Sequence, residues 1–133
     1  MTFLFTDLEG STRLWEQHPE SMGSALASHD AIVRSIVAAH DGYVFSTAGD
    51  AFSTAFWTPQ AAARAAAEIQ QRLAETHWPG AVTLRARIGL HTGVADERDG
   101  DYFGPTVNRT ARITAAGHGG RPVALGPLHP PSP

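Results

Sequence analysis

The stretch FLFTDLEGST, residues 3–12, decides how the chain begins to fold. Its apolar run at residues 3–5 predicts a buried strand, and the turn that follows predicts a helix capped by Ser11 or Thr12. Asp7 therefore lies at the point where a strand passes into a helix. A carboxylate there suits two roles, a cap for the next helix or a ligand for a molecule that binds at the strand end.

The composition limits the classes of protein to consider. A length of 133 residues fits one domain, which buries roughly two thirds of the surface of its unfolded chain. The absence of cysteine excludes disulfides and thiolate metal sites. The net charge of -3 and the lack of a basic block argue against a nucleic-acid partner.

Hydropathy gives no sign of a membrane partner. No apolar run approaches the roughly 20 residues that a membrane-spanning helix requires. Asp7 and Glu9 interrupt the N-terminal apolar run, so a signal peptide is not predicted either. We therefore expect a protein that has no membrane partner and is located in the cytoplasm.

Periodicity predicts strands and helices along the chain. Apolar residues between 26 and 40 recur at helical spacing, and Asp41-Gly42 supplies a helix stop. Thr58 is a predicted cap, and Pro59 at the first helical position opens an alanine-rich helix. The predicted elements are a strand from residue 3, helices to about 18 and over 26–40, strands at 43–45 and 51–57 joined by a turn at 48–50, a helix over 59–77, a strand over 84–91, a helix over 104–116 and a further strand from 123.

This order of elements predicts an α+β fold. We expect a ferredoxin-like sandwich, in which a mainly antiparallel sheet has its helices packed on one face. A single domain without internal repeats is expected over residues 1–125. The segment 126–133 contains four prolines and predicts a disordered tail.

Two aspartates, Asp7 and Asp50, lie at ends of predicted strands. Taken singly, each favours a structural role, because Asp7 suits a cap and Asp50 suits a hairpin turn. If the first strand lies beside the hairpin, as sequential elements usually do, the two carboxylates come close together. Paired carboxylates repel unless a cation lies between them, and oxygen ligands without thiolates suit Mg²⁺ or Mn²⁺. The loop over residues 8–12 would then offer backbone N–H groups to a phosphate.

A second group of polar residues lies in the last predicted helix. Asn108 and Arg112 are four residues apart, so they share one face of that helix. The guanidinium of an arginine binds two phosphoryl oxygens and keeps its charge, which suits a phosphoryl group being transferred. The alternative is a solvated helix with Arg112 near its C-terminal dipole, and the spacing alone favours neither interpretation.

Four motifs in order give the sequence a resemblance to a known family. They are FTDLEGST at residues 5–12, GDAF at 49–52, RIGLHTG at 87–93 and DYFGPTVNRTAR at 101–112. Together they resemble the catalytic domain of class III adenylate/guanylate cyclases, particularly the bacterial branch, over residues 3–123. The domain expected over 1–125 is therefore expected to be cyclase-like.

The resemblance implies a reaction in intracellular signalling. A purine nucleoside triphosphate, ATP first, would become a 3′,5′-cyclic nucleotide and pyrophosphate in a homodimer with two Mg²⁺ or Mn²⁺ ions per site. Asp7, Asp50 and the adjoining Leu8 would hold the metals. From the other chain, Asn108 would orient the ribose and Arg112 would stabilise the transition state. The residues implied to bind substrate are Gly10, Ser11, Thr12, Ser46 and Asp101.

Departures from the family favour a second interpretation. Ser46 stands where adenylate cyclases have a lysine that helps select adenine. The chain contains no lysine at all, so the family's triphosphate-binding lysine is also absent, and the sequence ends early compared with the family. The alternative function is therefore a catalytically weak or inactive cyclase-like module that binds nucleotide or dimerises.

Histidines and tryptophans are interpreted as structural. His29 and His40 are expected on a helix face, because no pair of histidines has a metal-binding spacing. Trp15, Trp57 and Trp78 are expected in the core or at an interface, since no basic patch accompanies them for base stacking.

Overall fold

The computed structural model describes residues 1–98, 101–116 and 122–124. Five strands form the main sheet in the order β2-β3-β1-β4-β7, and β5 and β6 form a separate two-stranded sheet. The strands are β1 (Thr2–Leu8), β2 (Tyr43–Ala48), β3 (Ala51–Phe56), β4 (Ala86–Thr92), β5 (Asp96–Arg98), β6 (Asp101–Phe103) and β7 (Pro122–Ala124). The helices are α1 (Ser11–Gln17), α2 (Pro19–Ala39), α3 (Pro59–Glu75) and α4 (Pro105–Ala116).

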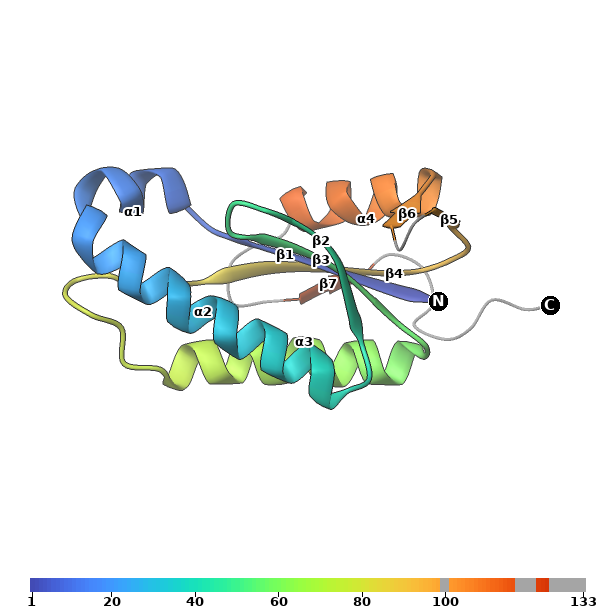
Figure 1. Cartoon of the computed structure of the whole chain (residues 1–133), viewed down its shortest axis with the longest axis horizontal. Coiled ribbons are helices and arrows are strands. Elements are labelled where there is room, and N and C mark those ends of the chain that lie inside the picture. The colour runs from blue at the N-terminus through green and yellow to red at the C-terminus, as the bar shows by residue number, and fades with distance from the viewer. Residues whose placement is uncertain (99–100, 117–121, 125–133) are drawn as a thin grey trace.

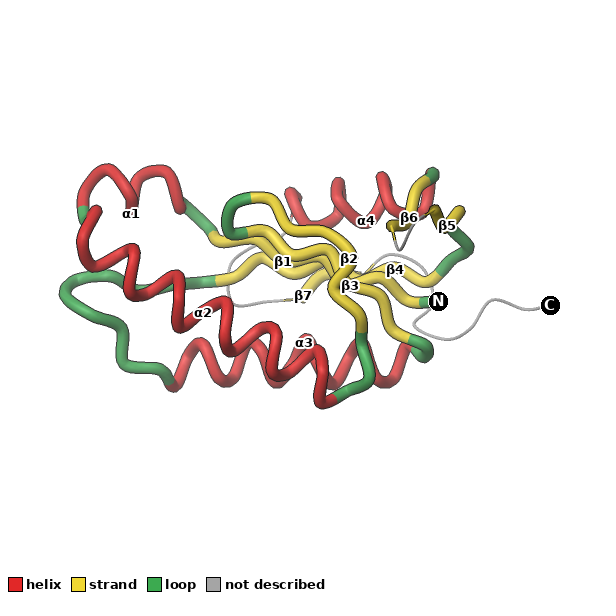
Figure 2. The backbone as a smooth tube through the Cα atoms, viewed as in Figure 1, coloured by secondary structure: helices red, strands yellow, loops and turns green. Residues whose placement is uncertain are grey.

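Helices cover both faces of the sheet (Figures 1 and 2). α2 and α3 lie on one face and α4 lies on the other. β1 pairs antiparallel with β3 and with β4, whereas β7 pairs parallel with β4. The α+β class with a mainly antiparallel sheet is confirmed. The expectation that every helix packs on one face is wrong for α4.

The burial of β1 on both faces explains why two layers of helix are needed. Leu4 and Leu8 belong to the larger core, which α2 and α3 complete. Phe3 and Phe5 point to the opposite face and form a smaller cluster with Ala55. Because both faces of the central strand are apolar, a helix layer on one side alone would leave phenylalanine side chains in water.

The helix boundaries follow local signals, with one correction. Thr58 caps α3, and its Oγ1 accepts a hydrogen bond from the backbone N of Ala61 at 3.1 Å. The stop predicted after α2 is present, with Asp41 in the left-handed region at φ 57°. The cap predicted for α1 is wrong: Gly10 occupies the N-cap position at φ 66°, and no side chain caps the helix. Glycine adopts this backbone conformation without steric cost.

α4 approaches β4 closely at two glycines. A methyl group at Gly89 would lie 2.7 Å from the backbone N of Thr114, and one at Gly93 would lie 2.8 Å from Cγ2 of Thr106. The hydroxyl of Thr114 donates to the carbonyl of Thr110 at 2.9 Å, and that of Thr110 donates to Thr106 at 2.7 Å. The threonine stripe therefore satisfies its own polar groups and can be buried against the sheet.

Replacing Gly89 with alanine is expected to destabilise the protein by about 1–3 kcal/mol, because the added methyl group overlaps backbone that cannot turn aside. Urea unfolding followed by circular dichroism measures the change. Gly23→Ala in α2 is the matched control: a Cβ there meets nothing within 4 Å, so the same change should add up to about 1 kcal/mol of stability. Unchanged stability of Gly89→Ala would contradict the close packing of α4.

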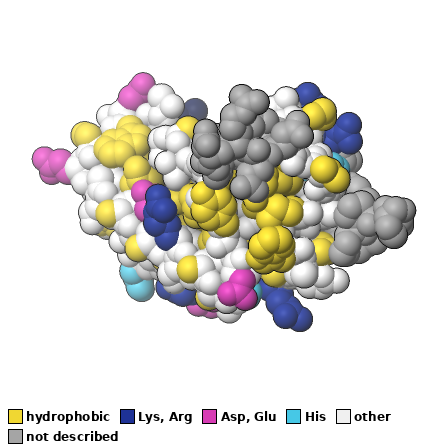
Figure 3. Space-filling model, turned by 45° about the vertical axis from the view of Figure 1, so that its right-hand side comes forward, with side chains coloured by type: hydrophobic (Ala, Val, Ile, Leu, Met, Phe, Trp, Pro, Cys, Tyr) yellow, Lys and Arg dark blue, Asp and Glu magenta, His cyan; other side chains and the backbone are white. Residues whose placement is uncertain are grey.

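The tryptophans divide between core and surface. Trp15 and Trp57 are 41% and 76% exposed, so the core is excluded for these two, and a place at an interface stays a prediction. Trp78 packs against the larger core and donates from Nε1 to the carbonyl of Leu73 at 3.2 Å. Hydrophobic side chains also gather in the middle of the face seen in the space-filling view (Figure 3).

The two histidines considered above make structural contacts. His29 on α2 is fully buried, with Nδ1 2.9 Å from Oδ1 of Asp30. His40, which follows α2, places Nε2 2.7 Å from Oε2 of Glu68 on α3.

Within the part of the chain that the structure describes, no helix combines the length and apolar character needed to cross a membrane. The tail predicted at 126–133 lies outside the described residues.

Candidate active site

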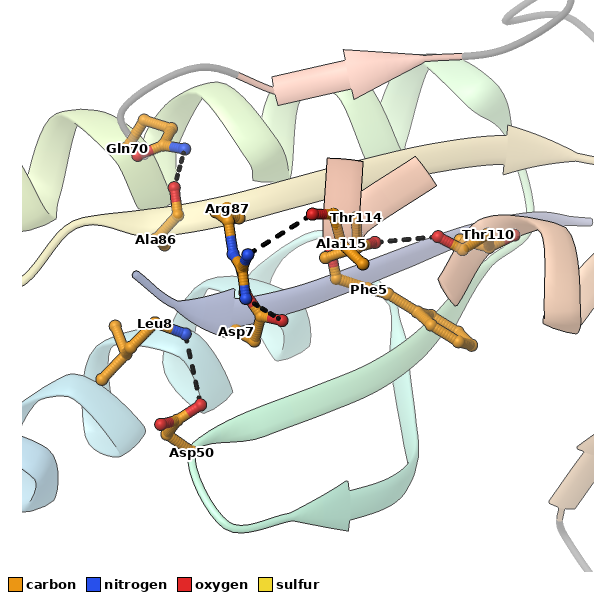
Figure 4. A network of polar contacts seen from close by, with 10 residues as sticks. All are labelled: Phe5, Asp7, Leu8, Asp50, Gln70, Ala86, Arg87, Thr110, Thr114 and Ala115. Atoms are coloured by element: carbon orange, nitrogen blue, oxygen red, sulfur yellow. Dashed lines mark hydrogen bonds and ion pairs between the residues drawn. The ribbon is translucent and has the colours of Figure 1, made fainter. Parts of the chain in front are cut away.

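Asp7 is held by an arginine on the neighbouring strand. It lies in β1 opposite Arg87 of β4 in the antiparallel register. Arg87 donates from Nε to Asp7 Oδ1 at 2.8 Å and from Nη2 to Asp7 Oδ2 at 3.0 Å (Figure 4). The side chain of Asp7 is 25% exposed and that of Arg87 is 30% exposed. A two-point, charge-assisted pair of this kind fixes the plane of the carboxylate.

Asp50 lies beside the same end of β1. It occupies the turn between β2 and β3, and the pairing of Thr6 with Phe52 extends toward this turn. Oδ1 of Asp50 accepts a hydrogen bond from the backbone N of Leu8 at 3.2 Å (Figure 4). The structure therefore brings Asp50 to the residue that follows Asp7, as the sequence predicts.

The charges around this strand end are mainly negative. The pKa of Arg87 is raised above its usual value, first by the hydrogen bond to Asp7, and also by the charges of Asp7, Glu9 and Asp50, although burial lowers it. All three carboxylates thus act on one guanidinium. Arg87 keeps its positive charge among these carboxylates. Carboxylates gathered at one place attract cations.

The residues present fit a hard divalent cation that takes part of its ligand shell from another molecule. Among the described residues, no group of three or more His, Cys, Asp or Glu side chains is arranged to hold a metal ion. Asp7 and Asp50 provide carboxylate oxygens only, which suits Mg²⁺ or Mn²⁺, and Mg²⁺ typically binds through one or two carboxylates plus substrate phosphates. The carbonyl of Leu8 as a third ligand stays a prediction.

The loop that follows Asp7 is exposed and begins α1. Gly10 and Thr12 are exposed and Ser11 is half-buried. The carbonyl of Gly10 accepts the backbone N–H of Leu14 at 3.1 Å, as an N-cap residue does. The role predicted for this loop in binding phosphate stays a prediction, as does that of its three residues.

Asn108 and Arg112 lie on the side of α4 that faces away from the sheet. Thr110, Ile113 and Thr114 are buried, whereas Asn108 and Arg112 are exposed. At 100° per residue, Asn108 and Arg112 each lie about 160° around the helix from Thr110. The structure therefore brings these two residues together, as their spacing predicts, but it points them away from the face on which Asp7 lies.

Ser46 lies on the same face of the sheet as Asp7. It pairs with Ser53, which in turn pairs with Phe5, and partners across neighbouring strands point to one face. Asp7 follows Phe5 by two residues and shares that face. This face is the one that α4 covers in part, since Phe5 belongs to the smaller apolar cluster.

The β5–β6 hairpin is anchored over the same region. The ring of Tyr102 makes edge contacts with the rings of Phe3 and Phe45, with centroids 5.4 Å and 5.0 Å apart. Asp101 precedes Tyr102 in β6, and Ser46 follows Phe45 in β2. The backbone therefore places Asp101 and Ser46 next to two residues whose rings are in contact. The side chain of Asp101 is outside the described structure.

Arg87 is the site residue that sequence reasoning missed. In the sequence it is only the first residue of the motif RIGLHTG, and the motif assigns it no role. The missing information is the register between β1 and β4, which joins residues 80 positions apart. A signal was nevertheless present, because a charged residue in an otherwise apolar strand needs a partner of opposite charge.

Comparisons with known proteins identify a matching family. The family model for the adenylate and guanylate cyclase catalytic domain matches residues 1–124. An uncharacterized protein of Mycobacterium tuberculosis is 40% identical over an alignment of 125 residues, which covers 92% of this chain and 41% of that protein. The adenylate cyclase of Schizosaccharomyces pombe is 34% identical over 146 residues, covering 91% of this chain and 9% of that enzyme. The chain thus spans less than half the length of either relative.

Solved structures give the same result. A structure of adenylate cyclases from Trypanosoma brucei in their monomeric state matches with a TM-score of 0.88 at 29% identity, covering 92% of this chain and 71% of that one. The family match includes β1, the β2–β3 hairpin, β4 and α4, the elements that carry Asp7, Asp50, Arg87, Asn108 and Arg112. The chain belongs to the adenylate and guanylate cyclase catalytic domain family.

Proposed function

We propose that this chain is a metal-dependent nucleotide cyclase that acts as a homodimer. It would convert a purine nucleoside triphosphate, ATP first, into the 3′,5′-cyclic nucleotide and pyrophosphate. The observation that carries the proposal is the division of the site residues into two groups. Asp7 and Asp50 meet at one end of β1, whereas Asn108 and Arg112 point outward from α4.

This division supports a site shared between two chains. Within one chain, the sheet-facing stripe of α4 is occupied by Thr110 and Thr114, so Arg112 points away from the Asp7 carboxylate. A second copy would supply Asn108 and Arg112 to the carboxylates of the first, and two-fold symmetry would then create two equivalent sites. The partly open face around Phe45 and Tyr102 offers apolar surface for that contact.

The reaction asks for positioning and for stabilisation of charge. The 3′-oxygen of the ribose attacks the α-phosphorus and loses its proton, while the bond from that phosphorus to the pyrophosphate oxygen breaks. Asn108 would orient the ribose, and Arg112 would bind the oxygens on which charge develops. Asp7, Asp50 and the Leu8 carbonyl would hold Mg²⁺ or Mn²⁺, which would supply positive charge to favour the 3′-alkoxide and to neutralise the triphosphate.

The base would be recognised by Asp101 and Ser46. As an acceptor, Asp101 can take the amino group of adenine or the N1–H and amino group of guanine. The hydroxyl of Ser46 can donate or accept, so it penalises the wrong purine less than a lysine would. We therefore propose weak discrimination between ATP and GTP.

The proposal is tested by incubating the purified protein with Mn²⁺ and either ATP or GTP, and by separating products by liquid chromatography with mass detection. Formation of cyclic nucleotide and pyrophosphate in equal amounts is the expected result. Tight nucleotide binding without any cyclic product would instead favour the second candidate, a binding or dimerisation module. Ser46 in place of lysine is the observation that favours this second candidate.

Replacing Ser46 with lysine is expected to raise the ratio of kcat/KM for ATP over GTP by about tenfold, because the new ammonium restores a charged donor beside the base. Thr47→Lys is the matched control. Thr47 is also exposed on β2 but pairs with Phe52, whose side chain lies in the larger core on the other face. A ratio that Ser46→Lys leaves unchanged, or that both variants change equally, would show that Ser46 does not face the base.

A further inference from the structure

We infer that Arg87 is the internal counter-ion of Asp7, that a metal ion entering at Asp7 displaces its guanidinium, and that this displacement loosens the last turn of α4. The inference rests on the proposed role of Asp7 as a metal ligand. It adds a residue of the same chain, Arg87, that competes with the metal for Asp7. It also adds a link from that metal to the helix that carries Asn108 and Arg112.

Both carboxylate oxygens of Asp7 are engaged by Arg87. The two N–O distances are 2.8 Å and 3.0 Å, and the residues are direct partners in the β1–β4 register. The pair is less than one third exposed on either side, so water screens it only in part. A metal ion that binds Asp7 must therefore compete with a fixed positive charge.

Arg87 yields its position only by moving. A guanidinium does not lose its proton in proteins, and both oxygens of Asp7 accept from it, so Arg87 leaves Asp7 only by swinging away. Mg²⁺ binds carboxylate oxygen at about 2.1 Å, much closer than a guanidinium nitrogen approaches. A divalent ion at that distance repels the guanidinium and takes lone pairs of the same two oxygens, so the two cations compete for Asp7.

The same guanidinium contacts α4. Nη1 of Arg87 donates to the carbonyl of Ala115 at 3.4 Å, in the last turn of the helix (Figure 4). Next to it, Thr114 donates from Oγ1 to the carbonyl of Phe5 at 3.4 Å. Arg87 thus joins Asp7 to the end of α4, and displacement from Asp7 removes this tether.

The link has a consequence for a homodimer. Asp7 and α4 of one chain would then serve different active sites, because α4 presents Asn108 and Arg112 to the partner. Metal occupancy at one site would change the freedom of a helix that serves the other site. A metal bound at Asp7 would thus change the affinity with which α4 of the same chain holds nucleotide. By linkage, nucleotide held by α4 would change the affinity of Asp7 for metal by the same factor.

The first test measures Mn²⁺ affinity without nucleotide, by titration calorimetry or by the electron paramagnetic resonance of free Mn²⁺. Arg87→Gln removes the competitor and is expected to tighten Mn²⁺ binding by about tenfold. Arg87→Lys keeps the charge but loses the two-point pair, so it should tighten binding by less; it also serves if Arg87→Gln fails to fold. The matched control Arg85→Gln, an exposed arginine two residues earlier, should leave the affinity nearly unchanged.

Two outcomes separate this inference from the proposed function. If Asp7→Asn abolishes Mn²⁺ binding while neither Arg87 variant tightens it, the inference is overturned and the metal role of Asp7 stands. If Asp7→Asn leaves Mn²⁺ binding intact in the wild-type and Arg87→Gln backgrounds alike, the metal role itself fails, and the inference fails with it.

The second test follows amide hydrogen exchange in the last turn of α4. Mn²⁺ is expected to speed exchange at Ile113, Thr114 and Ala115 in the wild-type protein, because the Arg87 tether is released. In Arg87→Gln the same amides should exchange rapidly from the start, with no further response to Mn²⁺. Exchange in wild-type α4 that Mn²⁺ leaves unchanged would overturn the link to the helix.

Discussion

Asp50→Ala is expected to lower Mn²⁺-dependent binding of ATP, and with it any cyclase activity, by about a hundredfold. A carboxylate ligand to a divalent ion is worth several kcal/mol, because it helps to hold the cation that neutralises the triphosphate. Calorimetric titration of the Mn²⁺–ATP complex into wild-type and variant protein measures the binding, and a coupled pyrophosphate assay measures the activity.

The fold is expected to survive this change. The described hydrogen bond of the Asp50 side chain is the one from the backbone N of Leu8, and losing it costs about 1 kcal/mol. Asp30→Ala is the matched control, since Asp30 is also a partly exposed carboxylate with one described side-chain partner, but it lies on α2. Equal affinity of wild type and Asp50→Ala would remove Asp50 from the metal site.

Mixing two inactive variants, Asp7→Ala and Arg112→Ala, is expected to restore about a quarter of the wild-type activity. Random association gives mixed dimers in about half of the population, and each mixed dimer rebuilds one of its two sites. The physical reason is the position of Arg112 on the exposed side of α4, opposite the buried Thr110 that faces the sheet.

The control for this experiment uses two variants from the same half of the site. A mixture of Asn108→Ala with Arg112→Ala cannot rebuild a site, so it should stay inactive at every ratio. Sedimentation of the wild type should show a dimer under the conditions of the assay. Full activity in a strictly monomeric preparation would contradict a site shared between chains.

The position of Asp50 beside the end of β1 was largely predictable from sequence. The apolar run before Asp7 indicates a strand, and the turn at Asp50 indicates a hairpin, so adjacency of consecutive elements brings the two carboxylates together. The ion pair with Arg87 was not predictable, because it depends on the register of β4 against β1. That register follows from the burial of both faces of β1 by distant helices, a property of the whole core.

The position of α4 was also not predictable, for a different physical reason. Its sheet-facing residues include Thr106, Thr110 and Thr114, which look polar in a hydropathy pattern. They can be buried because Thr110 and Thr114 donate to carbonyls one turn earlier in the helix. The pattern therefore gives no strong apolar stripe to show which face of the sheet the helix covers.

Because β1 lies between β3 and β4, opening it locally costs more free energy than opening the β5–β6 sheet. The strand that carries Asp7 is hydrogen-bonded on both edges in the five-stranded sheet, whereas Asp101 lies in a two-stranded sheet made of β5 and β6. Two-stranded hairpins are marginal in water and open at low free-energy cost. Tyr102 packs on Phe3 and Phe45, but β5 pairs only with β6 in the described structure, so on warming the segment that carries Asp101 would open before the end of β1 that carries Asp7.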